Sequence, residues 1–125
     1  MTESIARISK DELAAQLDAD DLQVIDVRRD WQHSQQKIKT AVHRDPKAVA
    51  DWTGQLDTGK RIVLYCSSPR EETSEAVARQ LLQAGFTDVR VLRGGWYVWR
   101  DAGFPVQRKE KEPVPERFVG GVLSD

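Results

Sequence analysis

Short apolar runs recur along the chain, separated by polar stretches. Those rich in Val, Ile and Leu have the length of buried β-strands and lie at residues 5–8, 22–27, 61–66 and 89–92. Within residues 22–27, Val24, Ile25 and Val27 place apolar side chains on both faces of the strand. A strand that is apolar on both faces is typical of a sheet covered on both sides.

Helical spacing appears between these runs. After residues 61–66, apolar side chains recur at Val77, Leu81 and Ala84, and Gly85 is placed to end that helix. Other helix starts are predicted at Ser9, at Asp45-Pro46 and at Trp96. The alternation of strands and helices predicts an α/β fold, an open and mostly parallel sheet with helices on both faces.

The composition indicates one globular domain in 125 residues. The net charge is −1 and acids are interleaved with bases, so we expect no nucleic-acid partner. No apolar run approaches the length of a membrane span, so no membrane insertion is expected.

Charge and proline become dense near the C-terminus. We predict that residues 1–106 form the folded domain and that residues 107–125 form a charged, flexible tail.

The chain has a single cysteine, Cys66, which excludes an internal disulfide and a multi-cysteine zinc site. His33 and His43 lack the spacing of metal ligands, so we expect neither a metal nor another cofactor. A lone thiol is typical of a reducing compartment and predicts a cytoplasmic protein.

Cys66 stands where the buried run 61–66 gives way to a helix. Main-chain N–H groups at such a turn, together with the helix N-terminus, favour a negative charge. They would favour the thiolate, which makes Cys66 a candidate catalytic nucleophile. The alternative is a buried structural thiol, since free cysteine often serves simply as a core residue.

The residues after Cys66 offer groups that bind anions, and Arg70 is the cation among them. The carboxylates of Glu71 and Glu72 would repel an anion if they faced the sulfur, but would act as helix-start acids if they faced outward. The candidate substrate-binding residues are Ser67, Ser68, Arg70, Glu71, Thr73 and Ser74.

Asp26, Arg28 and Trp96 fall near the carboxyl ends of predicted strands, where parallel sheets form their sites. They are candidates for the rim of a pocket. The alternatives are an ion pair between Asp26 and Arg28 that braces the strand end, and a core position for Trp96.

Several segments, in their order and spacing, resemble the rhodanese-like domains: Val24-Ile25-Asp26-Val27-Arg28, Tyr65-Cys66, Leu81-Leu82-Gln83-Ala84-Gly85-Phe86, Val91-Leu92-Arg93-Gly94-Gly95, and Trp99 through Ala102-Gly103-Phe104-Pro105-Val106. The resemblance covers roughly residues 22–106 and implies a five-stranded parallel sheet flanked by helices. It also implies that Cys66 accepts a sulfane sulfur as a persulfide and passes it to a thiol or to cyanide.

Two segments depart from the usual pattern of this family. Its active loop runs Cys-x-x-Gly-x-Arg-Ser; with Ser74 aligned to that serine, the loop here is two residues longer and Thr73 replaces the arginine. Pro69 replaces the glycine, and the resulting Cys-x-x-Pro-x-Glu pattern is similar to a subgroup that includes rhodanese domains attached to DedA-type membrane proteins. Residues 36–41 read Gln-Lys-Ile-Lys-Thr-Ala where the family usually reads Gly-His-Ile-Pro-Gly-Ala.

Three functions follow as hypotheses. The first is a sulfurtransferase that moves a sulfane sulfur from thiosulfate or a persulfide donor to a thiol or cyanide through a Cys66 persulfide. The second is a catalytically weak or inactive rhodanese-like module that binds a protein partner or regulates an attached domain. The third is a phosphatase-like variant, which ranks last because the loop lacks the terminal arginine that phosphatases of this fold use.

Overall fold

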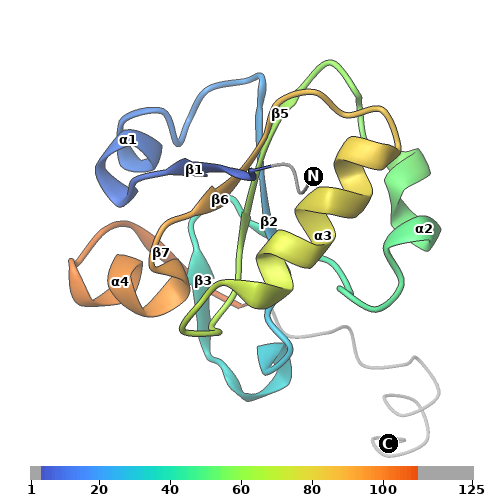
Figure 1. Ribbon diagram of the computed structural model, residues 1–125. Coiled ribbons are helices and arrows are strands. Elements are labelled where there is room, and N and C mark those ends of the chain that lie inside the picture. The colour runs from blue at the N-terminus through green and yellow to red at the C-terminus, as the bar shows by residue number, and fades with distance from the viewer. Residues whose placement is uncertain (1–3, 110–125) are drawn as a thin grey trace, which may run out of the picture.

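The computed structural model describes residues 4–109. Its main sheet is entirely parallel and five-stranded, which confirms the predicted fold class (Figure 1). In spatial order the strands are β1 (Ala6–Ile8), β6 (Val89–Leu92), β5 (Arg61–Tyr65), β2 (Leu22–Asp26) and β4 (Val42–His43).

Helices cover both faces of this sheet (Figure 1). α1 (Lys10–Ala15) and α4 (Gly95–Asp101) pack on one face, and α2 (Val49–Trp52) and α3 (Glu72–Gln83) pack on the other. Successive residues of each strand point to opposite faces, so β5 contributes to both apolar cores. Val63 packs in the core with α1 and α4, whereas Leu64 packs in the core with α2 and α3.

A second, two-stranded sheet was not expected from the sequence. β3 (Gln36–Ile38) pairs antiparallel with β7 (Val106–Arg108), and the Lys109 N–H donates to the Gln35 carbonyl at 3.0 Å. Residues 107–109 therefore continue the fold rather than begin a tail. The tail expected over residues 110–125 lies outside the described residues.

The helix start predicted at Asp45-Pro46 was wrong, because α2 begins at Val49. The Asp45 carboxylate accepts a hydrogen bond from the Lys47 N–H at 2.9 Å and closes a turn instead of capping a helix. A one-turn helix, η2 (Thr53–Gln55), follows α2, and another, η1 (Trp31–His33), precedes β3. The Ser9 capping box is present, with Ser9 and Glu12 bonding reciprocally.

Within residues 4–109, no helix has the length and apolar character needed to cross a membrane.

Candidate active site

Cys66 directly follows β5 at the carboxyl edge of the sheet, as the sequence predicts. Since β5 lies between β6 and β2, the cysteine leaves the sheet at its centre. The Cys66 carbonyl oxygen accepts a hydrogen bond from the Trp96 N–H, with an N···O distance of 2.9 Å. The start of α4 is therefore tied to the end of β5.

Cys66 is buried at the end of β5. The residue is 1% exposed and packs in the apolar core on the α3 side of the sheet. In the connection between β5 and α3, Pro69 and Arg70 are exposed, and Ser67 and Ser68 are half-buried. Cys66 itself is therefore almost wholly closed to solvent, whereas the connection that follows it is partly open.

The backbone around Cys66 offers hydrogen-bond donors without acceptors. The Glu71 N–H donates to the Ser68 carbonyl at 3.0 Å, and Pro69 has no N–H. Within residues 4–109 no acceptor is found for the backbone N–H groups of Ser67, Ser68, Arg70, Glu72, Thr73 and Ser74. The last three of these residues open α3, a helix of 12 residues, and the first three lie in the connection before it. Peptide dipoles at the N-terminus of a helix favour an anion.

The hydroxyl groups of the connection differ in their contacts. Ser67 Oγ donates to Asp30 Oδ1 at 2.7 Å, and Ser68 Oγ lies 3.4 Å from Thr73 Oγ1. The Ser74 side chain is fully buried, and its hydroxyl has no hydrogen-bond partner among the described residues. A buried hydroxyl without a partner is unusual in a native protein and marks this point beside the connection as a candidate ligand contact.

Glu71 lies just before α3 in the left-handed conformation, with φ 62° and ψ 26°. Its carboxylate accepts a hydrogen bond from the Gly94 N–H at 3.1 Å and pairs with Arg7 Nε at 2.8 Å. Glu72 is exposed at the first residue of α3. The Glu71 carboxylate is thus bound to β1 and to the turn before α4, and Glu72 takes the expected position of a helix-start acid.

Sequence reasoning missed Arg7 and Asp30, which contact the connection from other parts of the chain. Arg7 carries a signal, because it is a charged residue inside the otherwise apolar run 5–8. Asp30 carries none, because the segment around it has no clear hydrophobic period.

Asp26 and Arg28 form a buried ion pair beside the site. Arg28 Nη2 lies 2.7 Å from Asp26 Oδ2, and the Tyr65 hydroxyl donates to the same carboxylate oxygen at 2.7 Å. Burial disfavours the charged guanidinium, but the hydrogen bonds to Asp26 and the negative charge of that carboxylate together raise the pKa of Arg28. Arg28 Cζ also lies 4.5 Å from the ring centroid of Trp96, which is itself buried. The pair fixes the ends of β2 and β5 against α4.

Among the pockets that residues 4–109 line, three lie near the carboxyl edge of the sheet. Arg28 lines two of them, each of about 260 Å³, and Trp96 lines one of these two. Ser68 and Thr73 line the third, of about 190 Å³. Cys66 lines none of the three, which agrees with its burial.

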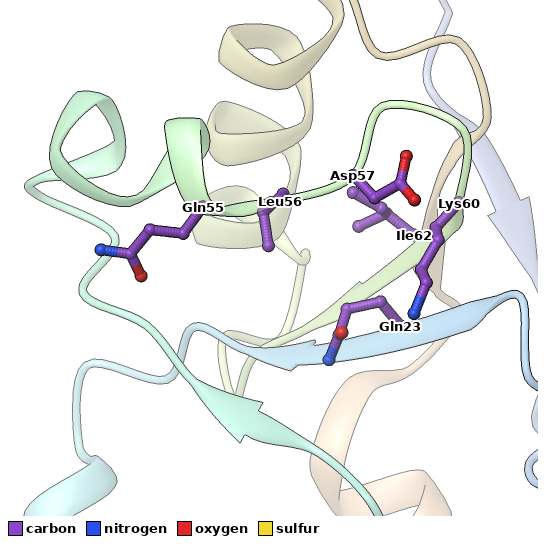
Figure 2. Close-up of a pocket in the computed structure, with 6 residues that line it drawn as sticks. All are labelled: Gln23, Gln55, Leu56, Asp57, Lys60 and Ile62. Carbon is purple, nitrogen blue, oxygen red and sulfur yellow. The ribbon is translucent and has the colours of Figure 1, made fainter.

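A further pocket lies at the opposite edge, where β2 and β5 begin. Its volume is about 120 Å³, and Figure 2 shows the side chains that line it, which are Gln23, Gln55, Leu56, Asp57, Lys60 and Ile62. None of these is a predicted site residue, so this pocket is separate from the candidate active site.

The first residue of α4 approaches the end of β5 so closely that glycine is required there. Gly95 has φ +64°, and a Cβ there would lie 2.4 Å from the Cys66 carbonyl oxygen. We expect Gly95→Ala to lower the free energy of unfolding by more than about 2 kcal/mol, because it adds a backbone clash to left-handed strain.

Gly103 is a matched control for that substitution. Its φ is +76°, but a Cβ there would meet nothing within 4 Å. Gly103→Ala should therefore cost only the strain of about 1 kcal/mol, measured by urea denaturation. Equal losses in the two variants would contradict the close approach of Gly95 to Cys66.

Residues 4–109 contain no group of three or more His, Cys, Asp or Glu side chains arranged to hold a metal ion. His43 instead stacks on Trp31, with ring centroids 4.3 Å apart and planes inclined by 8°. Its Nε2 lies 3.4 Å from the Arg28 carbonyl oxygen. Burial lowers the pKa of His43, although the nearby Asp26 carboxylate opposes this.

We therefore expect the free energy of unfolding to fall as the pH drops below about 6.5, the ordinary pKa of histidine. Because the pKa of His43 is lowered in the folded protein, the unfolded chain takes up the proton more readily, so the stability present above that pH is lost as the pH falls. Urea denaturation across this range would show the slope. His43→Gln should reduce it.

Comparison with known proteins bears on this arrangement. The family model of the rhodanese-like domain matches residues 9–102. Thiosulfate sulfurtransferase GlpE of Pseudomonas aeruginosa (strain LESB58) is 31% identical over 100 residues, which cover 80% of this chain and 88% of that protein. Thiosulfate sulfurtransferase YnjE of Escherichia coli is 59% identical over 32 residues, which cover 26% of this chain and 7% of that protein.

Solved structures share the fold. The crystal structure of a full-length protein from Lactobacillus plantarum has a TM-score of 0.76 and 26% identity, and the match covers 82% of this chain and 88% of that one. The solution structure of a rhodanese-like domain from Anabaena has a TM-score of 0.72 and 21% identity, with coverage of 90% and 86%. The family match over most of the chain, on a sheet of this topology, shows that the protein belongs to the rhodanese-like family.

Proposed function

We propose that this protein is a sulfurtransferase in which Cys66 carries the transferred sulfur. The Cys66 thiolate attacks the outer sulfur of thiosulfate, the sulfur–sulfur bond of the donor breaks, and sulfite leaves with the bonding electron pair. A thiolate or cyanide then attacks the outer sulfur of the persulfide. The second step releases a new persulfide or thiocyanate and restores the Cys66 thiolate.

The observation that carries this proposal is the set of N–H groups without acceptors that follows Cys66 at the start of α3. Such donors stabilise a thiolate, a persulfide and a departing sulfite in turn, since all three are anions. In this proposal, side-chain hydroxyls donate further hydrogen bonds to these anions, namely those of Ser67, Ser68, Thr73 and Ser74. Arg70 attracts the anionic donor from its exposed position.

The buried ion pair serves the same site indirectly. Arg28 and Trp96 line a pocket of about 260 Å³, and Asp26 holds Arg28 in place. We infer that these residues form part of the rim from which the donor approaches. Glu71 takes part through the position of its carboxylate rather than by touching the donor.

Mass spectrometry tests the proposal on the unmodified protein. After incubation with thiosulfate, we expect one extra sulfur atom on the peptide that contains Cys66, and cyanide should remove it as thiocyanate. Protein whose thiol has been alkylated beforehand should gain no sulfur. Absence of the adduct with thiosulfate and with an organic persulfide would overturn the proposal.

The burial of Cys66 favours a second candidate function, a weakly active or inactive binding module. If the connection never opens, the carboxyl edge of the sheet serves only as a surface for a protein partner or an attached domain. Iodoacetamide separates the two candidates, because it is small and uncharged. An alkylation rate of Cys66 far below that of free cysteine, combined with no sulfur adduct, would favour the binding module.

A further inference from the structure

The connection between β5 and α3 is held at both ends by hydrogen bonds from the start of α4, which we call its two ties. At its start, the Trp96 N–H donates to the Cys66 carbonyl at 2.9 Å. At its end, the Gly94 N–H donates to the Glu71 carboxylate at 3.1 Å. Residues 67–70 span the distance between these two ties, so the position of the Glu71 carboxylate helps to set the shape of the whole connection.

The Glu71 carboxylate is held there by Arg7, from the edge strand β1. Arg7 Nε lies 2.8 Å from Glu71 Oε1, and Arg7 Nη2 contacts the Glu75 carboxylate on the first turns of α3. The Arg7 and Glu71 side chains are only 20% and 13% exposed, so solvent screens this pair less than a fully exposed one. One guanidinium therefore joins β1 to both the end of the connection and α3.

The charges matter because the donor of the proposed reaction is an anion. Residues 67–71 contain one cation, Arg70, and one acid, Glu71. Without a counter-ion, the Glu71 carboxylate would oppose both the thiolate and an approaching thiosulfate. The pair with Arg7, a guanidinium that Glu71 shares with Glu75, offsets part of this charge. The pair and the bond from the Gly94 N–H also hold the carboxylate toward β1 and the turn before α4.

We propose that Arg7 is a positioning residue for the connection between β5 and α3. It offsets the charge of Glu71 and holds that carboxylate in its hydrogen bond to the Gly94 N–H, which leaves Arg70 and the backbone N–H groups to receive the anion. This inference rests on the proposed sulfurtransferase function for its catalytic meaning. The tie itself, however, is a property of the loop that can be measured without sulfur transfer.

Arg7→Gln tests the inference through kinetics. We expect KM for thiosulfate to rise about tenfold, with a smaller change in kcat, because an unpaired carboxylate repels the donor before the chemical step. Arg7→Lys keeps the charge and should recover most of the affinity. Adding Glu71→Gln to Arg7→Gln should also lower KM again, since no acid remains to be neutralised.

Arg79→Gln is the matched control. Arg79 pairs with Glu75 at 3.5 Å, so its loss removes the same charge from the same side of α3 without touching Glu71. It should leave KM for thiosulfate within about twofold of the starting value. If Arg79→Gln raised KM as much as Arg7→Gln, general charge rather than the tie would be responsible, and the inference would fail.

Charge-selective alkylation supplies a readout that needs no sulfur transfer. Iodoacetate is an anion and iodoacetamide is neutral, so the ratio of their rates at Cys66 reports the charge near the sulfur. We expect Arg7→Gln to lower the iodoacetate-to-iodoacetamide ratio about threefold or more, and the Glu71→Gln double variant to restore it. If Arg7→Gln does not fold, Arg7→Met replaces it, because its unbranched side chain keeps the packing.

The two readouts separate the two proposals. If the protein takes no sulfur from any donor but the alkylation ratio falls as expected, the sulfurtransferase proposal fails and the role of Arg7 stands. If Arg7→Gln lowers only the melting temperature and leaves both KM and the ratio unchanged, Arg7 is a purely structural residue and the inference is overturned.

Discussion

Cys66→Ser is expected to reduce the release of thiocyanate from thiosulfate and cyanide by about a thousandfold or more. A serine hydroxyl is a far weaker acid than a thiol, and it can neither attack a sulfane sulfur at neutral pH nor carry the sulfur afterwards. Cys66 is the single cysteine of the chain, so its replacement leaves no other thiol to take over. The measurement is the rate of thiocyanate formation, together with the mass of the protein after incubation with thiosulfate.

The burial of Cys66 makes a second variant necessary. Serine would place a hydroxyl where the thiol now packs among apolar side chains, and a loss of activity could then reflect a loss of folding. Cys66→Ala removes the thiol without adding a polar group. Both variants should be inactive while the melting temperature of Cys66→Ala stays close to that of the unmodified protein. Persistent thiocyanate formation by a folded Cys66→Ala would contradict the proposed chemistry.

The main sheet was predictable because its strands carry their own signal. Residues 61–65 and 89–92 are short apolar runs of β-branched residues and leucine, and both became strands of the parallel sheet. β3 and β7 carry no such signal. Their residues read Gln-Lys-Ile and Val-Gln-Arg, and only their pairing across the chain makes them strands. The apolar pattern therefore does not predict that the domain extends beyond residue 106.

The helix start at Asp45 failed for a local reason. Asp and Pro in succession favour both a capped helix and a turn, and the same carboxylate–amide hydrogen bond closes either structure. Here the Asp45 carboxylate accepts from the Lys47 N–H, and the backbone turns before Val49 begins α2. The local sequence favours both structures and therefore does not decide between them.

The position of Cys66 was predictable from a single rule: in parallel sheets, binding and catalytic sites form at the carboxyl ends of the strands. The surroundings of the cysteine were not. Whether Glu71 faces the sulfur depends on Arg7 and Gly94, which are distant in the sequence and meet it only in the folded chain. The burial of the thiol likewise follows from its packing in the apolar core on the α3 side of the sheet. The residue types of a site are thus visible in the sequence, whereas their orientations depend on contacts with remote strands.

Asp26→Ala is expected to lower the free energy of unfolding by about 3–5 kcal/mol. The substitution leaves the Arg28 guanidinium, which is 1% exposed, without its counter-ion, and it also removes the acceptor of the Tyr65 hydroxyl. Burial and the Asp26 charge raise the pKa of Tyr65, so the phenol stays protonated and would be left without that acceptor. Urea denaturation followed by tryptophan fluorescence measures the loss.

An exposed pair provides the comparison that makes this result specific. Asp21 bonds to Arg61 at 2.9 Å, close to the distance in the Asp26–Arg28 pair, but both partners lie at the surface. Asp21→Ala should therefore cost far less than Asp26→Ala. Combining Asp26→Leu with Arg28→Met should recover much of the loss, because no unpaired charge then stays buried. Equal costs at the two aspartates would mean that the buried pair does not brace β2 and β5, and that Arg28 shapes the pocket rim without supporting the fold.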